Sequence, residues 1–99
     1  MTGGVAGHAD GSASLPGLNF YNDTDTGIFR PTTNGVAIAG NGVEIARFGH
    51  SGTSPIIGFY GNTGFVKQTV SGSRGGNVAL ASLLSALNTI GLIADASSA

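Results

Sequence analysis

Short runs of β-branched and aromatic residues recur along most of this chain, separated by glycine, proline, asparagine and serine. This spacing is typical of a small all-β unit. The candidate strands are residues 18–21, 27–30, 35–39, 43–48, 56–60 and 65–70. The predicted fold class is therefore mainly β, a small antiparallel β-hairpin module with one C-terminal α-helix.

The segment VAIAGNGVEIARF carries the clearest hairpin signal. Large and small apolar residues alternate over 36–39, and Asn41 and Gly42 can both take the positive φ of a type I′ turn. Alternation predicts the faces of the return strand, with Val43 and Ile45 on one side and Glu44 and Ala46 on the other. A longer loop over 61–64 predicts a second hairpin, which returns through the strand at 65–70.

The segment that follows residue 76 changes to helical periodicity. Asn77 is a good N-cap, and Gly91 stands where a left-handed C-cap belongs, with Leu92 able to fold back over the last turn. Spacings of three and four define the apolar stripe of this helix, which is Leu80, Leu83, Leu84, Leu87 and Ile90. Because most of these positions also form an a/d seam, the stripe can face the chain's own strands or the helices of sister chains.

Composition divides the chain into four parts. Residues 1–14 are predicted to be an extended Gly/Ala/Ser arm, mobile unless something holds it, because they offer too little apolar surface to offset their ordering entropy. The β module follows over 15–70, residues 71–76 form a flexible joint, and residues 77–99 hold the C-terminal helix and a tail.

Charged residues are scarce and make up only 9% of the chain, whereas a soluble domain carries about 25%. With so much glycine, alanine and serine, few side chains remain to keep the surface of a single chain solvated. We infer that identical chains cover one another. The net charge of −1 gives no basic face, so nucleic acid is not expected as a partner.

Several kinds of site and location are excluded by what the sequence lacks. Without cysteine there is no disulfide, zinc-thiolate site or thiol nucleophile. The start of the chain shows no secretory signal, and the apolar stretch over 78–93 is interrupted by polar residues and shorter than a membrane span. The protein is expected to be made in a cytoplasm and to have no membrane partner.

Two segments resemble proteins of tailed-bacteriophage particles. Residues 12–52 contain DTDTGIFRP and a hairpin that ends in GNGVEIARF, and they are similar to a module of tail-fibre and other virion proteins. Residues 68–95 are similar to the C-terminal segment of another set of phage-particle proteins. The resemblance implies a non-enzymatic virion component, and fibre-type members are usually homotrimers.

The chain is short for a tail fibre, since it holds little more than one module. Its length favours a capsid decoration or head-fibre component, an intertwined or abutting homotrimer that attaches to the phage capsid and stabilises the particle. The alternative is a tail-fibre or tailspike component for host attachment, which would bind bacterial surface glycan through exposed aromatic side chains. The candidates for that contact are Phe59, Tyr60 and Phe65.

Asp23 and Asp25 stand two residues apart in a segment, residues 22–27, that is rich in turn-forming side chains. A structural turn is the favoured interpretation. Arg30 is near enough in sequence to pair with either aspartate, within a chain or between chains. A Ca²⁺ site is an alternative that lacks the further oxygen ligands and the glutamate of an EF-hand loop.

The other polar residues predict no catalytic, metal or cofactor site. His8 and His50 have no second ligand close by in sequence, although three copies of one histidine could hold a metal on a trimer axis. Arg74 could hold an anion at the start of the helix, but the lysine of a P-loop is absent. An enzyme such as a depolymerase would need paired carboxylates in a cleft, and Glu44 is the single glutamate. No enzymatic activity is expected.

Overall fold

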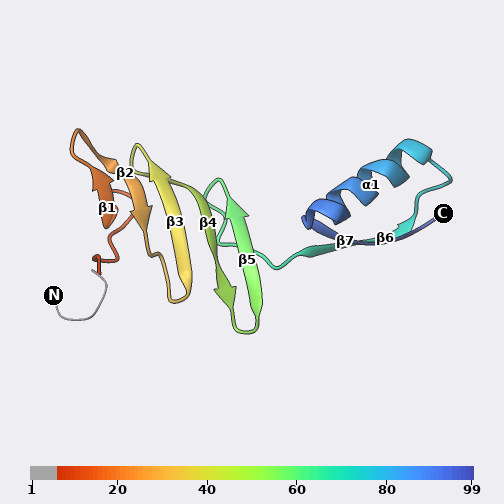
Figure 1. Ribbon diagram of the computed structural model, residues 1–99, viewed down its shortest axis with the longest axis horizontal. Coiled ribbons are helices and arrows are strands. Elements are labelled where there is room, and N and C mark those ends of the chain that lie inside the picture. The colour runs from red at the N-terminus through yellow and green to blue at the C-terminus, as the bar shows by residue number, and fades with distance from the viewer. Residues whose placement is uncertain (1–6) are drawn as a thin grey trace. The chain divides into compact units, whose positions relative to one another are not determined.

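The computed structural model describes residues 7–99, and its elements are drawn in Figure 1. They fall into two units, one ending at Gly64 and the other beginning at Phe65. The first unit is a five-stranded sheet, and the second combines two strands with a helix. The predicted fold class is confirmed at this level: the chain is mainly β, with an antiparallel sheet and one C-terminal helix in the described part.

The strands of the first unit follow one another across the sheet in chain order, each antiparallel to its neighbour. They are β1 (Leu18–Phe20), β2 (Asp23–Phe29), β3 (Gly35–Gly40), β4 (Val43–Ser51) and β5 (Ser54–Phe59). Short turns suffice between antiparallel neighbours, because no crossover is needed. The first five predicted strands are thus confirmed, although β2 begins at Asp23 and not at residue 27.

Asn41 and Gly42 form the predicted two-residue turn between β3 and β4. Their φ angles of 52° and 75° are both positive, as a type I′ turn requires. This turn is local in origin, because asparagine and glycine tolerate the left-handed region that most residues avoid.

The predicted placement of Glu44 and Ala46 on one face of β4 is wrong because the strand contains a β-bulge. The pairing with β3 shifts by one residue, which leaves Ile45 without a partner. Ala46 then lies opposite Ile38, and Glu44 lies opposite Ala39 on the other face of the sheet. Glu44 and Ala46 were predicted to share a face and are instead on opposite faces.

One face of the sheet is covered by the segment that precedes β1. The buried side chains beneath it are Phe29, Ala37 and Ala39. Ala13 packs against them, and the carbonyl of Asp10 accepts a hydrogen bond from the Arg30 amide at 2.9 Å. The predicted mobile arm is therefore held by the sheet over residues 10–13, whereas its residues 1–6 lie outside the described part.

The second unit is built from β6 (Gln68–Ser73), α1 (Val78–Ile90) and β7 (Ile93–Ser98), with β6 and β7 paired in parallel. A parallel pair needs a crossover, and α1 provides it. The predicted joint at 71–76 and the predicted tail are therefore corrected, since residues 71–73 belong to β6 and the tail forms β7. The second predicted hairpin is also wrong, because residues 62–64 turn back over Gly58 and β6 pairs with β7.

Helix α1 begins and ends as predicted. The side chain of Asn77 accepts a hydrogen bond from the Leu80 amide at 2.9 Å. Gly91 has a left-handed φ of 97°, and the Leu92 amide donates to the Leu87 carbonyl at 3.0 Å, which completes a Schellman motif. Both caps satisfy backbone groups that the helix itself leaves unpaired.

The apolar stripe of α1 is only partly used inside the second unit. The helix contacts β7 and buries Leu84, and Leu87 is half-buried. Leu80, Leu83 and Ile90 are exposed. A role for these residues as a seam between chains stays a prediction. Among residues 7–99, no helix combines the length and the hydropathy that crossing a bilayer would require.

Candidate functional site

Asp23 and Asp25 lie in strand β2, so the predicted turn at these aspartates is wrong. The turn comes earlier, at residues 21 and 22. The backbone of the segment is used by the neighbouring hairpin, since the Asp25 carbonyl accepts a hydrogen bond from the Gly42 amide at 2.9 Å. Two threonines alternate with the aspartates, and β-branched residues suit an extended strand.

The carboxyl groups of Asp23 and Asp25 point to the same face, because the two residues are two positions apart in a strand. A hydrogen bond with Asp23 raises the pKa of Asp25, and desolvation and the negative charge of Asp23 act in the same direction. Within the described residues there is no group of three or more metal-ligating side chains. The geometry therefore gives the Ca²⁺ alternative no support and leaves two neighbouring carboxyl groups, of which Asp25 has the raised pKa.

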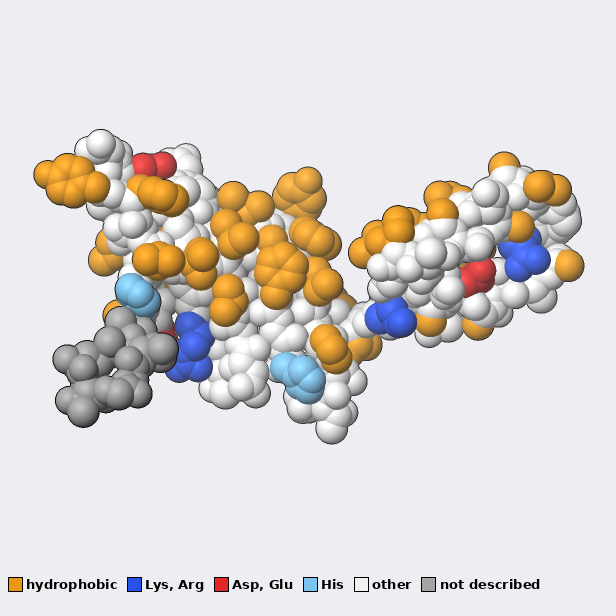
Figure 2. Space-filling model, viewed as in Figure 1, with side chains coloured by type: hydrophobic (Ala, Val, Ile, Leu, Met, Phe, Trp, Pro, Cys, Tyr) orange, Lys and Arg blue, Asp and Glu red, His pale blue; other side chains and the backbone are white. Residues whose placement is uncertain are grey.

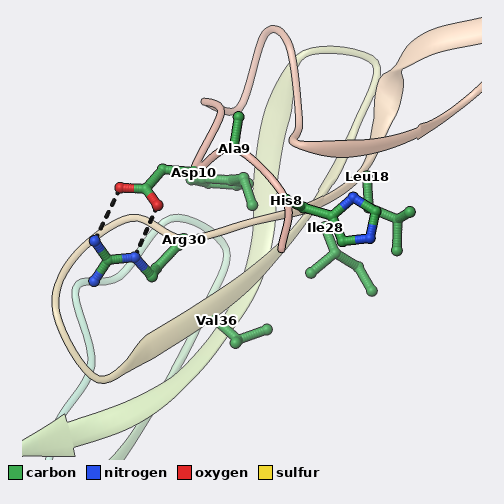
Figure 3. A pocket seen from close by; sticks show the side chains of 8 residues that line it. His8, Ala9, Asp10, Leu18, Ile28, Arg30 and Val36 are labelled. Carbon is green, nitrogen blue, oxygen red and sulfur yellow. Dashed lines mark hydrogen bonds and ion pairs between the residues drawn. The ribbon is translucent and has the colours of Figure 1, made fainter. Parts of the chain in front are cut away.

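Arg30 pairs with Asp10 and with neither of the predicted aspartates. Arg30 Nε donates to Asp10 Oδ1 at 2.9 Å and Nη2 donates to Oδ2 at 3.0 Å, a bidentate contact shown in Figure 3. This hydrogen bonding lowers the pKa of the Asp10 carboxyl. About half of each side chain is exposed, 49% and 58%, so the pair orients the segment before β1 more than it stabilises the fold.

An open depression lies beside this ion pair, and Figure 3 shows His8 pointing toward Leu18 and Ile28 at its edge. His50 is in strand β4, and its Nδ1 is 2.9 Å from the Gly52 carbonyl oxygen, within hydrogen-bonding distance. The two histidines therefore lie in different environments. Neither belongs to a metal-ligating cluster in the part of the chain that the structure describes.

Glu44 and Arg47 form an ion pair that sequence reasoning missed. Arg47 Nε donates to Glu44 Oε2 at 2.9 Å and Nη2 donates to Oε1 at 2.6 Å. Their side chains are only 12% and 18% exposed. Residues three apart in a regular strand face opposite ways, and the bulge at Ile45 places both on the covered face. Opposite charges at this spacing within an apolar strand are the signal that would have revealed both bulge and pair.

Arg74 is engaged by strand β7. Its Nη1 donates to Ser97 Oγ at 2.8 Å, and its backbone amide donates to the Ser98 carbonyl at 2.8 Å. Hydrogen bonds from Ser97 lower the pKa of Asp95, and the positive charge of Arg74 contributes. The guanidinium therefore serves the parallel strand pair, which removes the basis for an anion site before the helix.

The sheet face opposite the core carries the large apolar side chains. Cross-strand pairing aligns Leu18, Ile28, Ile38, Ala46 and Phe59 in one row, and Val36, Phe48 and Ile57 in the next. We define the open face as Leu18, Ile28, Val36, Ile38, Phe48, Ile57 and Phe59. Each of these side chains is between 41% and 55% exposed. Figure 2 shows hydrophobic side chains gathered over this sheet.

The charged side chains of strands β2 to β5 lie on the covered face. Glu44 and Arg47 are opposite the buried Ala39 and Ala37, and Asp23 and Asp25 alternate onto the same side. In a one-sided antiparallel sheet of a single chain, large apolar residues face the core and polar residues face water. Here small residues and one phenylalanine form the core, and valine, isoleucine and phenylalanine point away from it.

The alternation over 36–39 can be read from the sequence. Which of the two sheet faces is covered cannot. That choice depends on the segment before β1, which covers the alanines through Ala13 and borders the larger residues only at Leu18, Ile28 and Val36. Comparison with protein-family models, with curated proteins and with solved structures finds no match to this chain.

Proposed function

We propose that this chain is a non-enzymatic structural protein of a tailed-bacteriophage particle, a homotrimer that attaches to the capsid and stabilises it. The observation that carries the proposal is the open face. A sheet that directs its large apolar side chains away from its own core has a surface suited to being covered by protein. The low content of charged residues, 9%, is consistent with a surface shared between chains.

The phage particle enters the proposal through the resemblance of residues 12–52 and 68–95 to virion proteins. In this role the protein would act mechanically, by holding capsid subunits together. Trimers suit the local three-fold positions of an icosahedral shell, where each docked trimer would tie neighbouring capsid subunits together. Stability of the particle, and not turnover of a substrate, is then the activity to measure.

The test is cryo-electron microscopy of the particle that carries this protein. Density for three copies of the chain on the capsid shell is the expected result. Particles that lack the protein should also release their DNA at a lower temperature than complete particles. Density confined to the tail would overturn the capsid role and favour the second candidate.

The second candidate is a tail-fibre or tailspike component for host attachment. Exposed aromatic residues favour it: Tyr60 is 95% exposed and has a left-handed φ of 57°, and Tyr21 is 96% exposed. Phe59 and Phe65 are exposed as well. A glycan array probed with the purified protein tests this function, and a Tyr60→Ala variant should lose any specific glycan signal if the aromatic ring makes the contact.

A further inference from the structure

We infer that the open face is the surface through which copies of this chain associate, an assignment that rests on the proposed oligomer and identifies where it forms. The face runs across all five strands, because the pairing from Leu18 to Ile28, Ile38, Ala46 and Phe59 is continuous. A parallel row of Val36, Phe48 and Ile57 widens it. Its partner must therefore offer a broad apolar surface.

The area of the open face suits a protein interface. Seven large side chains, each about half exposed, leave on the order of 400 Å² of apolar surface if an aliphatic side chain contributes about 100 Å² and a phenylalanine about 200 Å². A stable interface buries about 800 Å² on each partner. In homodimer interfaces about 65% of the buried area is apolar. The open face alone supplies most of that apolar share.

Charge identifies the partner as a second copy of the chain. None of the seven residues of the open face is charged, and Arg30, which lines a depression with Leu18, Ile28 and Val36, is already paired with Asp10. A charged partner would find nothing to pair with, and desolvation of its charges would oppose binding. An identical open face is equally apolar, is present at equal concentration, and lies on every copy.

The exposed side of helix α1 is the competing apolar surface. Val78, Leu80, Leu83 and Ile90 are exposed there, but they lie on one narrow element and alternate with serine, alanine and threonine. The helix thus offers four large apolar side chains, against seven on the open face. It therefore provides the matched control, because Leu83 is 54% exposed and Phe48 is 43% exposed.

The experiment compares sedimentation velocity of the full chain with the Phe48→Glu and Leu83→Glu variants. The wild type should sediment as a trimer. Phe48→Glu should weaken association by about a hundredfold or more, because each copy would bury an unpaired carboxylate. Leu83→Glu should remain trimeric. Circular dichroism establishes that both variants are folded.

A second measurement covers the case in which Phe48→Glu does not fold. The chain has no cysteine, so Ile38→Cys and Tyr21→Cys each carry a single thiol, on the open face and on the β1–β2 turn. In the oligomer, alkylation of Ile38→Cys should be at least about tenfold slower than alkylation of Tyr21→Cys, because a covered thiol is not accessible.

The outcomes separate the inference from the proposed function. A wild-type dimer that depends on Phe48 would keep the open face as the self-association surface and overturn the trimer. If the wild type is a trimer that persists in Phe48→Glu, and Ile38→Cys is alkylated rapidly, the open face is not the association surface, whereas the proposed trimer stands. A single-chain wild type would overturn both.

Discussion

Glu44 and Arg47 illustrate how one extra residue in a strand changes which side chains meet on a face of the sheet. Their bidentate pair exists because the bulge at Ile45 turns two residues with i, i+3 spacing onto one face. If the Glu44 carboxylate is removed, the largely buried Arg47 guanidinium has no charged partner. Such a loss costs more than the loss of an exposed pair.

We therefore expect Glu44→Gln to lower the free energy of unfolding by about 1–3 kcal/mol. The matched control is Asp10→Asn, which removes a bidentate carboxylate from the half-exposed Arg30 and should cost clearly less. Urea denaturation of both variants at the same protein concentration measures the difference. Equal losses at the two sites would show that burial of the Glu44–Arg47 pair adds nothing.

The Asp23–Asp25 pair predicts a pH dependence that differs in sign from that of Asp10. The pKa of Asp25 is raised in the folded chain, so its interaction stabilises the fold at low pH and is lost as pH rises through the raised pKa. The pKa of Asp10 is lowered, so its contribution is present at neutral pH and is lost as pH falls through the lowered pKa.

Asp25→Asn should accordingly raise the unfolding temperature at pH 7, because it removes the repulsion between two ionised carboxylates. The gain should disappear at about pH 3, where aspartate is largely protonated even without a perturbation. Asp10→Asn should lower the unfolding temperature at pH 7 and have less effect at the acidic pH. Thermal unfolding followed by circular dichroism at both pH values tests the two variants together, and identical pH profiles would contradict the assignment.

Elements whose signals are local could be predicted from the sequence. The Asn41-Gly42 turn and both caps of α1 depend on residues within one turn of the chain, and each has the predicted conformation. Elements that depend on distant partners could not be predicted. Strand β7 forms because β6 is beside it, across a 13-residue helix, and Arg30 finds Asp10 twenty positions away.

The candidate site also combines features with local signals and features that depend on distant partners. Alternation over 36–39 indicated one face of large residues and one of small residues, but only the covering segment decides which face is buried. The turn interpretation of Asp23 and Asp25 failed because Asp23 pairs with Phe20 of β1 and the turn after β3 bonds the Asp25 carbonyl, and both partners hold the segment extended. Local turn propensity was outweighed by pairing with a neighbouring hairpin.

The caps of α1 allow a test at the scale of the element. Asn77→Ala should destabilise the chain by about 1 kcal/mol through loss of the hydrogen bond to the Leu80 amide. Gly91→Ala should cost about 1–2 kcal/mol, because a Cβ disfavours the left-handed φ at this position. Ser82→Ala, in the exposed middle of the helix, is the control and should be neutral or slightly stabilising. Urea denaturation of the three variants measures these changes.

At the scale of the whole molecule, charged and apolar side chains are separated between the two faces of one sheet. The covered face holds the ion pair and the carboxyl pair, and the open face holds seven large apolar residues. A sheet arranged in this way makes association hydrophobic in character. The physical signature of such association is a dependence on temperature with little dependence on salt.

We expect that raising the salt concentration to about 1 M, where the Debye length is about 3 Å, leaves the association constant unchanged or increases it. Cooling should weaken association, because hydrophobic stabilisation decreases at low temperature. Sedimentation equilibrium over a matrix of salt concentrations and temperatures measures both effects, with Arg30→Gln as the variant that removes the charge bordering the open face beside Leu18, Ile28 and Val36. If salt dissociated the wild type and Arg30→Gln removed that sensitivity, exposed ion pairs such as Arg30–Asp10 would have to join the chains, and the apolar face would require another occupant.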